Sequence, residues 1–193
     1  MKMPRLALAA TAAALLAGCG IQSIPQAENA VAAAWAEVEN QYQRRADLVP
    51  NLVETVKGYA THERETLEAV VAARAQATQV KLSADQLTPE NLKRFEQAQN
   101  ALSGALGRLL AVSESYPQLK ASESFRDLQA QLEGTENRIA IARRRYIEEV
   151  RRFNDLVTVP PSSFTNGLMY HKQPKAQFTA TTAGAEKAPS VKF

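Results

Sequence analysis

Apolar residues recur at steps of three and four through most of this chain, which is the spacing of one buried face of a helix. The first such stripe contains Val31, Trp35, Val38 and Tyr42. No alternating pattern long enough for a strand interrupts these stripes. The predicted helices span residues 27–45, 47–79, 89–113 and 122–157.

Proline marks the expected boundaries of these helices, because a proline inside a helix costs about 3 kcal/mol. Thr88 can cap a helix that has Pro89 at its first position. In the same way, Asp47 can cap a second helix with Pro50 in its first turn. The alternative at Pro50 is a kink within one continuous helix. Tyr116-Pro117 ends the third stripe.

Four amphipathic helices joined by short connections must bury their stripes against one another. The fold class expected is therefore all-α, an antiparallel up-and-down four-helix bundle with long helices. Gly104 and Gly107 within the third helix indicate a close helix contact. Beyond residue 157 the helical period is lost, and residues 164–178 are expected to pack along the bundle as a strap. Residues 179–193 have little to bury and are expected to be disordered.

The N-terminus has the parts of a secretion signal: Lys2 and Arg5, an uncharged run over 6–16, and a small-residue exit. The run is too short for a membrane span of about 20 residues. Leu-Ala-Gly-Cys at 16–19 resembles the lipobox of bacterial lipoproteins. The resemblance implies cleavage before Cys19, with diacylglycerol and an N-acyl chain attached to that residue. An ordinary secretory signal with an incidental cysteine is the alternative.

This interpretation divides the chain into four parts and gives it a location. A membrane-tethered protein facing the periplasm is expected, in the outer rather than the inner membrane, because Gly20 follows the cysteine where an inner-membrane retention signal would have Asp. The parts are a signal peptide (1–18), a lipidated linker (19–26), a helical domain (27–178) and a disordered tail (179–193).

Charge and composition argue against several function classes. Without Lys2 and Arg5, 21 basic residues stand against 20 acidic ones, a net charge of +1. Nucleic-acid binding, which needs a clustered basic excess, is not expected. One cysteine and two histidines offer few ligands for a metal, and His62 has no second ligand at helical spacing. We therefore expect no metal and no cofactor beyond the lipid on Cys19, and no catalytic residues, because no glycine-framed serine or phosphate loop occurs.

Two sets of polar residues are candidate functional surfaces. The first steps by four, three and four along a helix and is either a buried polar network that fixes helix register or a surface that binds a partner. It consists of Asn40, Arg44, Asp47 and Asn51. The second is the densest basic patch, either a solvated face paired with interleaved acids or a face for anionic lipid headgroups. It consists of Arg143, Arg144, Arg145, Arg151 and Arg152.

The stretch AWAEVENQYQRRADLVPNLVETVKGYA at 34–60 resembles the signature of the LemA family. The resemblance continues through LKAS at 119–122, LEGTENRI at 132–139 and RRRY at 143–146, and covers about residues 28–178. It implies a membrane-associated helical bundle whose molecular activity is not established. The function expected is a non-enzymatic, lipid-anchored scaffold or adaptor for other envelope proteins. The alternatives are an accessory subunit of an envelope protease or hydrolase, and a membrane-shaping lipid-binding protein.

Overall fold

The computed structural model describes residues 21–178, which are helical almost throughout and contain no strand. The all-α prediction is confirmed. The predicted signal peptide, Cys19 and the predicted tail at 179–193 lie outside the described residues. The elements are α2 (Ser23–Lys57), α3 (Arg64–Gln79), α4 (Pro89–Ser113), α5 (Pro117–Ala121), α6 (Glu123–Thr158), α7 (Ser162–Thr165) and the π-helical η1 (Asn166–Tyr170).

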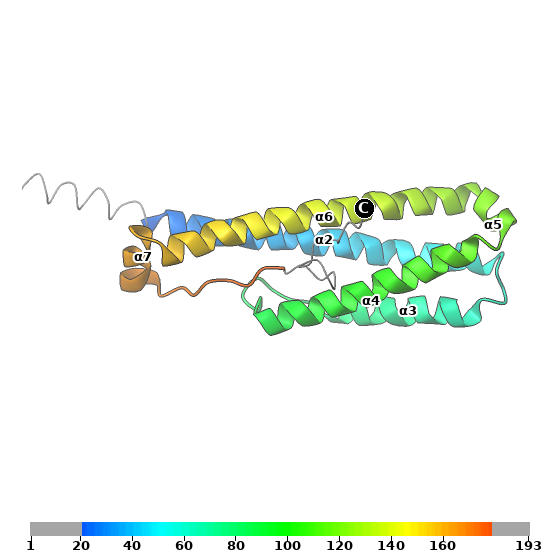
Figure 1. The fold of residues 1–193 in the computed structure, drawn as a ribbon, viewed down its shortest axis with the longest axis horizontal. Coiled ribbons are helices and arrows are strands. Elements are labelled where there is room, and N and C mark those ends of the chain that lie inside the picture. The colour runs from blue at the N-terminus through cyan, green and yellow to red at the C-terminus, as the bar shows by residue number, and fades with distance from the viewer. Residues whose placement is uncertain (1–20, 179–193) are drawn as a thin grey trace, which may run out of the picture.

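Two long helices, α2 and α6, run along the length of the molecule (Figure 1). α2 and α6 run antiparallel and contact each other along their length. α3 and α4 form a second antiparallel pair, which lies beside the half of α2 and α6 that is remote from α7. The chain after η1 returns along the other half of the long pair. One half of the α2–α6 pair therefore packs against α3 and α4, and the other half against the chain after η1.

α2 passes through Pro50 without a break, so the alternative of one continuous helix is confirmed and the predicted separation of two helices at residues 45–47 is wrong. A proline has no N–H to donate to the carbonyl four residues earlier, here that of Ala46. The structure supplies another donor, because Nε of Arg74 on α3 lies 2.7 Å from the Ala46 carbonyl oxygen. A side chain from a neighbouring helix thus satisfies the group that Pro50 leaves unpaired.

The break occurs instead at Gly58, which caps the C-terminus of α2. The turn that follows is held by Tyr116, whose hydroxyl donates to the Glu63 carboxylate at 3.0 Å. The predicted stripe over 47–79 therefore belongs to two helices that run in opposite directions. Tyr59 and Val71, expected on its buried face, are 46% and 52% exposed.

The packed domain begins earlier than predicted. α2 starts at Ser23, inside the expected linker 19–26, and Ile24 is fully buried. Gly104 and Gly107 also differ from expectation, because a Cβ atom added at either would meet nothing within 4 Å. Neither glycine is required for a close helix contact.

The buried apolar side chains form two clusters. The first surrounds Trp35, whose ring meets those of Phe95 and Tyr146 edge-on at centroid distances of 5.3 and 5.4 Å. The second lies between the far half of the long helices and the α3–α4 pair, and includes Leu52, Leu102, Leu109, Phe125 and Leu132.

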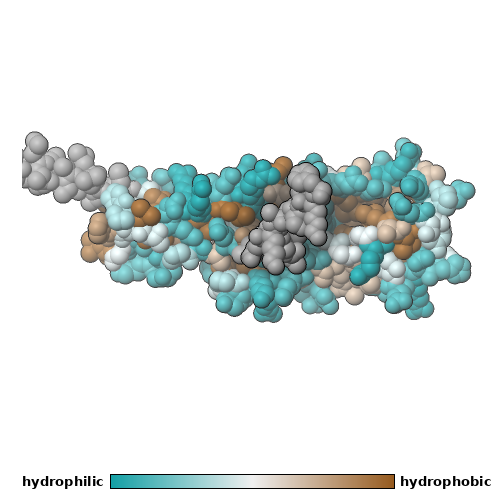
Figure 2. Space-filling model, in the orientation of Figure 1, coloured by the Kyte–Doolittle hydropathy of each residue, from teal (hydrophilic) through white to brown (hydrophobic). Residues whose placement is uncertain are grey.

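The strap packs over part of its predicted length only. Phe178 is buried beside Trp35, and the Tyr146 hydroxyl donates to the Ala176 carbonyl at 2.8 Å. Burial raises the pKa of Tyr146 well above its usual range. Phe164 and Leu168, by contrast, are exposed. Figure 2 shows a mostly hydrophilic surface on this side of the molecule, with hydrophobic residues at the α7 end.

Candidate functional site

A layer of buried polar side chains crosses the molecule near the middle of the long helices. Its centre is Arg45 on α2, which is only 1% exposed. One guanidinium nitrogen donates to Ser103 Oγ at 2.6 Å and to Glu136 Oε1 at 2.8 Å. The other donates to the side-chain oxygen and the carbonyl of Gln99 at 2.7 and 3.1 Å. One arginine therefore ties α2 to both α4 and α6.

A second arginine extends the layer toward the strap. Nη2 of Arg143 on α6 lies 2.7 Å from the Glu96 carboxylate on α4, and Nη1 donates to the Tyr42 hydroxyl at 3.4 Å. The guanidinium carbon also lies 4.2 Å from the centre of the Phe178 ring. Burial raises the pKa of Glu96, and the charge and hydrogen bond of Arg143 only partly oppose this effect. Burial likewise raises the pKa of Tyr42.

The polar layer separates the two apolar clusters. A one-turn slip of any of the three helices would leave buried donors and acceptors without partners, which costs more than an equal slip in a purely apolar core. We interpret the layer as a device that fixes the mutual register of α2, α4 and α6.

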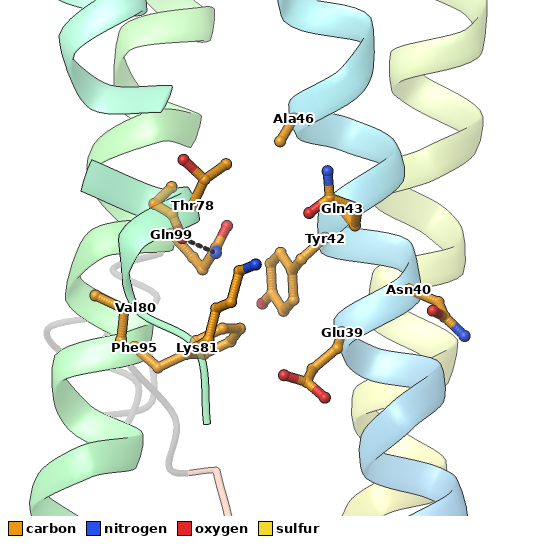
Figure 3. A pocket seen from close by; sticks show the side chains of 11 residues that line it. Glu39, Asn40, Tyr42, Gln43, Ala46, Thr78, Val80, Lys81, Phe95 and Gln99 are labelled. Atoms are coloured by element: carbon orange, nitrogen blue, oxygen red, sulfur yellow. Dashed lines mark hydrogen bonds between the residues drawn. The ribbon is translucent and has the colours of Figure 1, made fainter. Parts of the chain in front are cut away.

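A pocket of about 270 Å³ opens beside this layer, between α2 and the segment that joins α3 to α4 (Figure 3). Tyr42, Gln43 and Glu39 face it from α2, and Gln99 points into it from α4. The Gln99 amide nitrogen donates to the Ala77 carbonyl at 3.3 Å. The lining residues are Glu39, Asn40, Tyr42, Gln43, Ala46, Ala77, Thr78, Val80, Lys81, Phe95 and Gln99.

Charged groups on both sides of the pocket could bind a small polar group. Burial raises the pKa of Glu39, while the Leu82 backbone N–H and the charge of Lys81 act in the opposite direction. The indole nitrogen of Trp35 donates to the Leu82 carbonyl at 2.7 Å, which holds the α3–α4 connection against α2. The pocket thus has the side chains of an acidic and a basic residue, Glu39 and Lys81, at its rim, and its lining residues include no serine, cysteine or histidine.

The first predicted polar set does not take part in the buried layer. Asn40, Arg44, Asp47 and Asn51 are all exposed on α2, and Asn40 lies at the edge of the pocket with its amide turned outward (Figure 3). Asp47 accepts a hydrogen bond from Gln43 of its own helix at 2.7 Å. The interpretation of this set as a buried network is therefore wrong, while its interpretation as a surface that binds a partner stays a prediction.

The second predicted set is divided by the structure. Arg143 turns inward to Glu96, so it does not belong to an exposed basic face. Arg144, Arg145, Arg151 and Arg152 are exposed. Glu148, Glu149 and Asp155 line the same shallow surface as the last two arginines, so the face carries both signs of charge.

Arg45, Glu96 and Gln99 were not predicted as functional residues, although their sequence positions carry a signal. Arg45 occupies a step of the stripe that runs from Val38 and Tyr42 to Val49. Gln99 likewise stands on the buried face of α4, where Ala98 was expected. A polar residue at a core position of an amphipathic helix was the missed indication.

A shallow apolar groove lies between the last turns of α2 and the first turns of α3. Val53, Leu67 and Val71 form its floor, and charged residues stand at its rim. Glu54 belongs both to this rim and to the α2 face, because it follows Asn51 by three residues. The rim also includes Lys57, Arg64 and Glu68.

The sequence profile of the LemA family matches residues 34–193. The chain belongs to the LemA family. The match begins in the first half of α2 and includes all of the polar layer of this LemA protein. Comparison with curated proteins finds no match. Within residues 21–178, no helix of the LemA protein combines the length and hydrophobicity that crossing a bilayer requires.

Proposed function

We propose that this LemA protein is a non-enzymatic scaffold or adaptor, tethered to a membrane of the bacterial envelope through lipid on Cys19 and facing the periplasm. The lipobox resemblance at 16–19 and Gly20 support a tether in the outer rather than the inner membrane. Such a protein needs a surface held at a distance from its anchor.

The observation that carries the proposal is the length of α2. Its 35 residues span about 50 Å, with the chain entering at Ser23 and the apolar groove at the opposite end. The exposed α2 face, which consists of Asn40, Arg44, Asp47 and Asn51, leads along the helix to that groove. A partner in the periplasm would therefore meet its binding surface well away from the membrane.

The groove suggests the chemistry of the partner. Its floor is apolar, and Glu54, Lys57, Arg64 and Glu68 place both signs of charge around it. This arrangement suits an amphipathic helix of an envelope protein, with an apolar stripe flanked by charged residues of both signs. The exposed polar face of α2 would extend the contact and orient the bound helix.

Two experiments test the proposal. Metabolic labelling with a fatty-acid analogue should modify the wild type and not Cys19→Ser, and equal labelling would refute the lipid tether. A photo-crosslinking amino acid at Val71 or Arg44 should capture the same envelope protein in intact cells. The matched control is the same amino acid at Arg108, an exposed arginine on α4. Equal capture from all three positions would refute binding at this surface.

A further inference from the structure

The end of the molecule formed by α7 and η1 exposes large apolar side chains. Phe164 is 74% exposed, Leu168 81% and Met169 53%. Val159, just before α7, is 52% exposed. Between Asp155 and Lys172 the sequence has no Asp, Glu, Lys or Arg. We call residues 159–170 the apolar tip. Exposed apolar residues grouped in this way usually mark a binding surface.

Hydrogen bonds of Asn166 fix the apolar tip to the end of α6 and to the segment that follows η1. Asn166 is buried and donates to the carbonyls of Val157 at 3.2 Å and Lys172 at 2.9 Å. Its side-chain oxygen accepts from the Lys172 N–H at 2.9 Å. The backbone of the tip is helical through α7 and η1. The helical bonds pair part of this backbone, and the last carbonyls can still bond to water at the bilayer interface, so the tip can enter the interface without leaving them unpaired.

The start of the described chain lies at the same end. The Tyr170 hydroxyl donates to the Ile21 carbonyl at 2.6 Å, which fastens η1 to the residue before α2. Ile21 is itself 43% exposed. Cys19 is two residues away, and two residues of chain reach at most about 7 Å. An anchor on Cys19, or the uncharged run at 6–16 if it were retained, would therefore hold a bilayer next to the apolar tip.

We infer that the apolar tip is a second membrane contact, in which Phe164, Leu168 and Met169 enter the interface of the bilayer that holds the anchor. This inference rests on the proposed tether for the position of the bilayer. The contact would restrain the tilt of the long helices, because an anchor and a separate apolar surface define an orientation that a flexible tether alone does not. The first charged residues on either side, Asp155 and Lys172, would remain on the aqueous side.

The test places a tryptophan at the tip of the full chain. Phe164→Trp is purified from bacterial membranes and reconstituted into vesicles of phosphatidylethanolamine and phosphatidylglycerol, with and without brominated lipid as a quencher. The matched control is Tyr59→Trp, which replaces a half-exposed aromatic residue at the opposite end of α2. Trp35 is 1% exposed, so the wild type supplies a constant background.

Brominated lipid should quench the fluorescence of the tryptophan at position 164 at least about threefold more strongly than that of the tryptophan at position 59. The reason is that interfacial side chains lie about 5–10 Å into the headgroup and acyl boundary. Equal quenching at both positions would overturn the inference. So would a blue shift at 164 without quenching, because it would mean that a second copy or another part of this chain covers the tip. Leu168→Trp provides an independent position if Phe164→Trp does not fold.

A separate measurement tests whether the protein is tethered through lipid on Cys19. Mass spectrometry of the purified chain shows whether Cys19 carries lipid, whatever the quenching result. A lipidated chain without quenching at 164 would overturn the apolar tip and leave the tether intact. Quenching at 164 in a chain without lipid on Cys19 would support the tip and refute the tether.

Discussion

Replacing Arg45 with alanine tests the buried polar layer most directly. The substitution removes the donor for four acceptors on α4 and α6. The cost of losing this donor differs among the four acceptors. The Glu136 side chain is 48% exposed and can turn to water, and Ser103 lies at an exposed position. The Gln99 carbonyl keeps its helical hydrogen bond within α4, but the buried side-chain oxygen Oε1 loses its donor.

The loss follows from these contacts. Leaving Gln99 Oε1 without a donor costs about 1–3 kcal/mol, and the contact of the guanidinium with Tyr42, whose ring centre lies 5.0 Å from the guanidinium carbon, is also lost. Two effects of the substitution reduce this loss of stability. The charge of Arg45 no longer has to be buried, and its Nε atom, which is buried without a hydrogen-bond partner, is removed. We expect a net loss of about 3 kcal/mol in the free energy of unfolding.

The assay is urea unfolding followed by circular dichroism at 222 nm, on the chain from residue 19 with Cys19→Ser. A loss of that size corresponds to a melting temperature lower by about 6–12 °C in a domain of this length. Arg44→Ala is the matched control, because its side chain is exposed on the same turn, and it should change stability by no more than about 0.5 kcal/mol. If Arg45→Ala and Arg44→Ala were equally stable, the polar layer would contribute nothing to the fold.

Two further predictions concern the core and the strap. Leu132→Ala, at a 4% exposed position, should cost about 2–5 kcal/mol in the same assay, and more than Leu128→Ala, whose side chain is only partly buried; equal losses would mean that α6 is wrongly oriented. Burial opposes ionisation of Glu28, but the hydrogen bonds and charges of Lys172 and Lys175 outweigh it and lower its pKa below 4.5. The ionised Glu28 therefore stabilises the fold above pH 4.5 and loses this contribution as the pH falls through its lowered pKa, so Glu28→Gln should be less stable than wild type at pH 7 and lose less stability on acidification. Identical pH profiles of unfolding would contradict this.

The helices themselves were predictable because their signals are local. α4 begins with the Thr88 cap and Pro89 and ends at Ser113, the residues predicted for both ends. α6 matches its predicted range to within a residue at each end. Caps, prolines and a 3.6-residue period act within a few residues of chain, so the sequence carries them in full.

The sequence left the choice between a break and a continuous helix at Pro50 open, because the contact that favours the continuous helix comes from Arg74, 24 residues away. From the sequence, a proline after a capping residue resembles a helix start, and Asp47 fitted that pattern. The stripe over 47–79 continues across the turn, so its period does not mark the end of α2 at Gly58 or the start of α3 at Arg64. The polar layer was missed because its contacts, like that of Arg74, join residues distant in the sequence. Arg45 gave an exception to the apolar stripe, but its acceptors come from residues 99, 103 and 136.

The sequence alone determined the helical class, most helix boundaries and membership of the LemA family, because periodicity, caps and family motifs are properties of the chain itself. Only the tertiary structure decided which polar residues are buried together, and that Arg44 faces solvent while Arg45 binds three side chains. It also decided that the apolar tip lies beside Ile21, two residues from Cys19. Such pairings depend on how distant segments meet in space, and the energy that selects them is summed over the whole core rather than recorded at any one position.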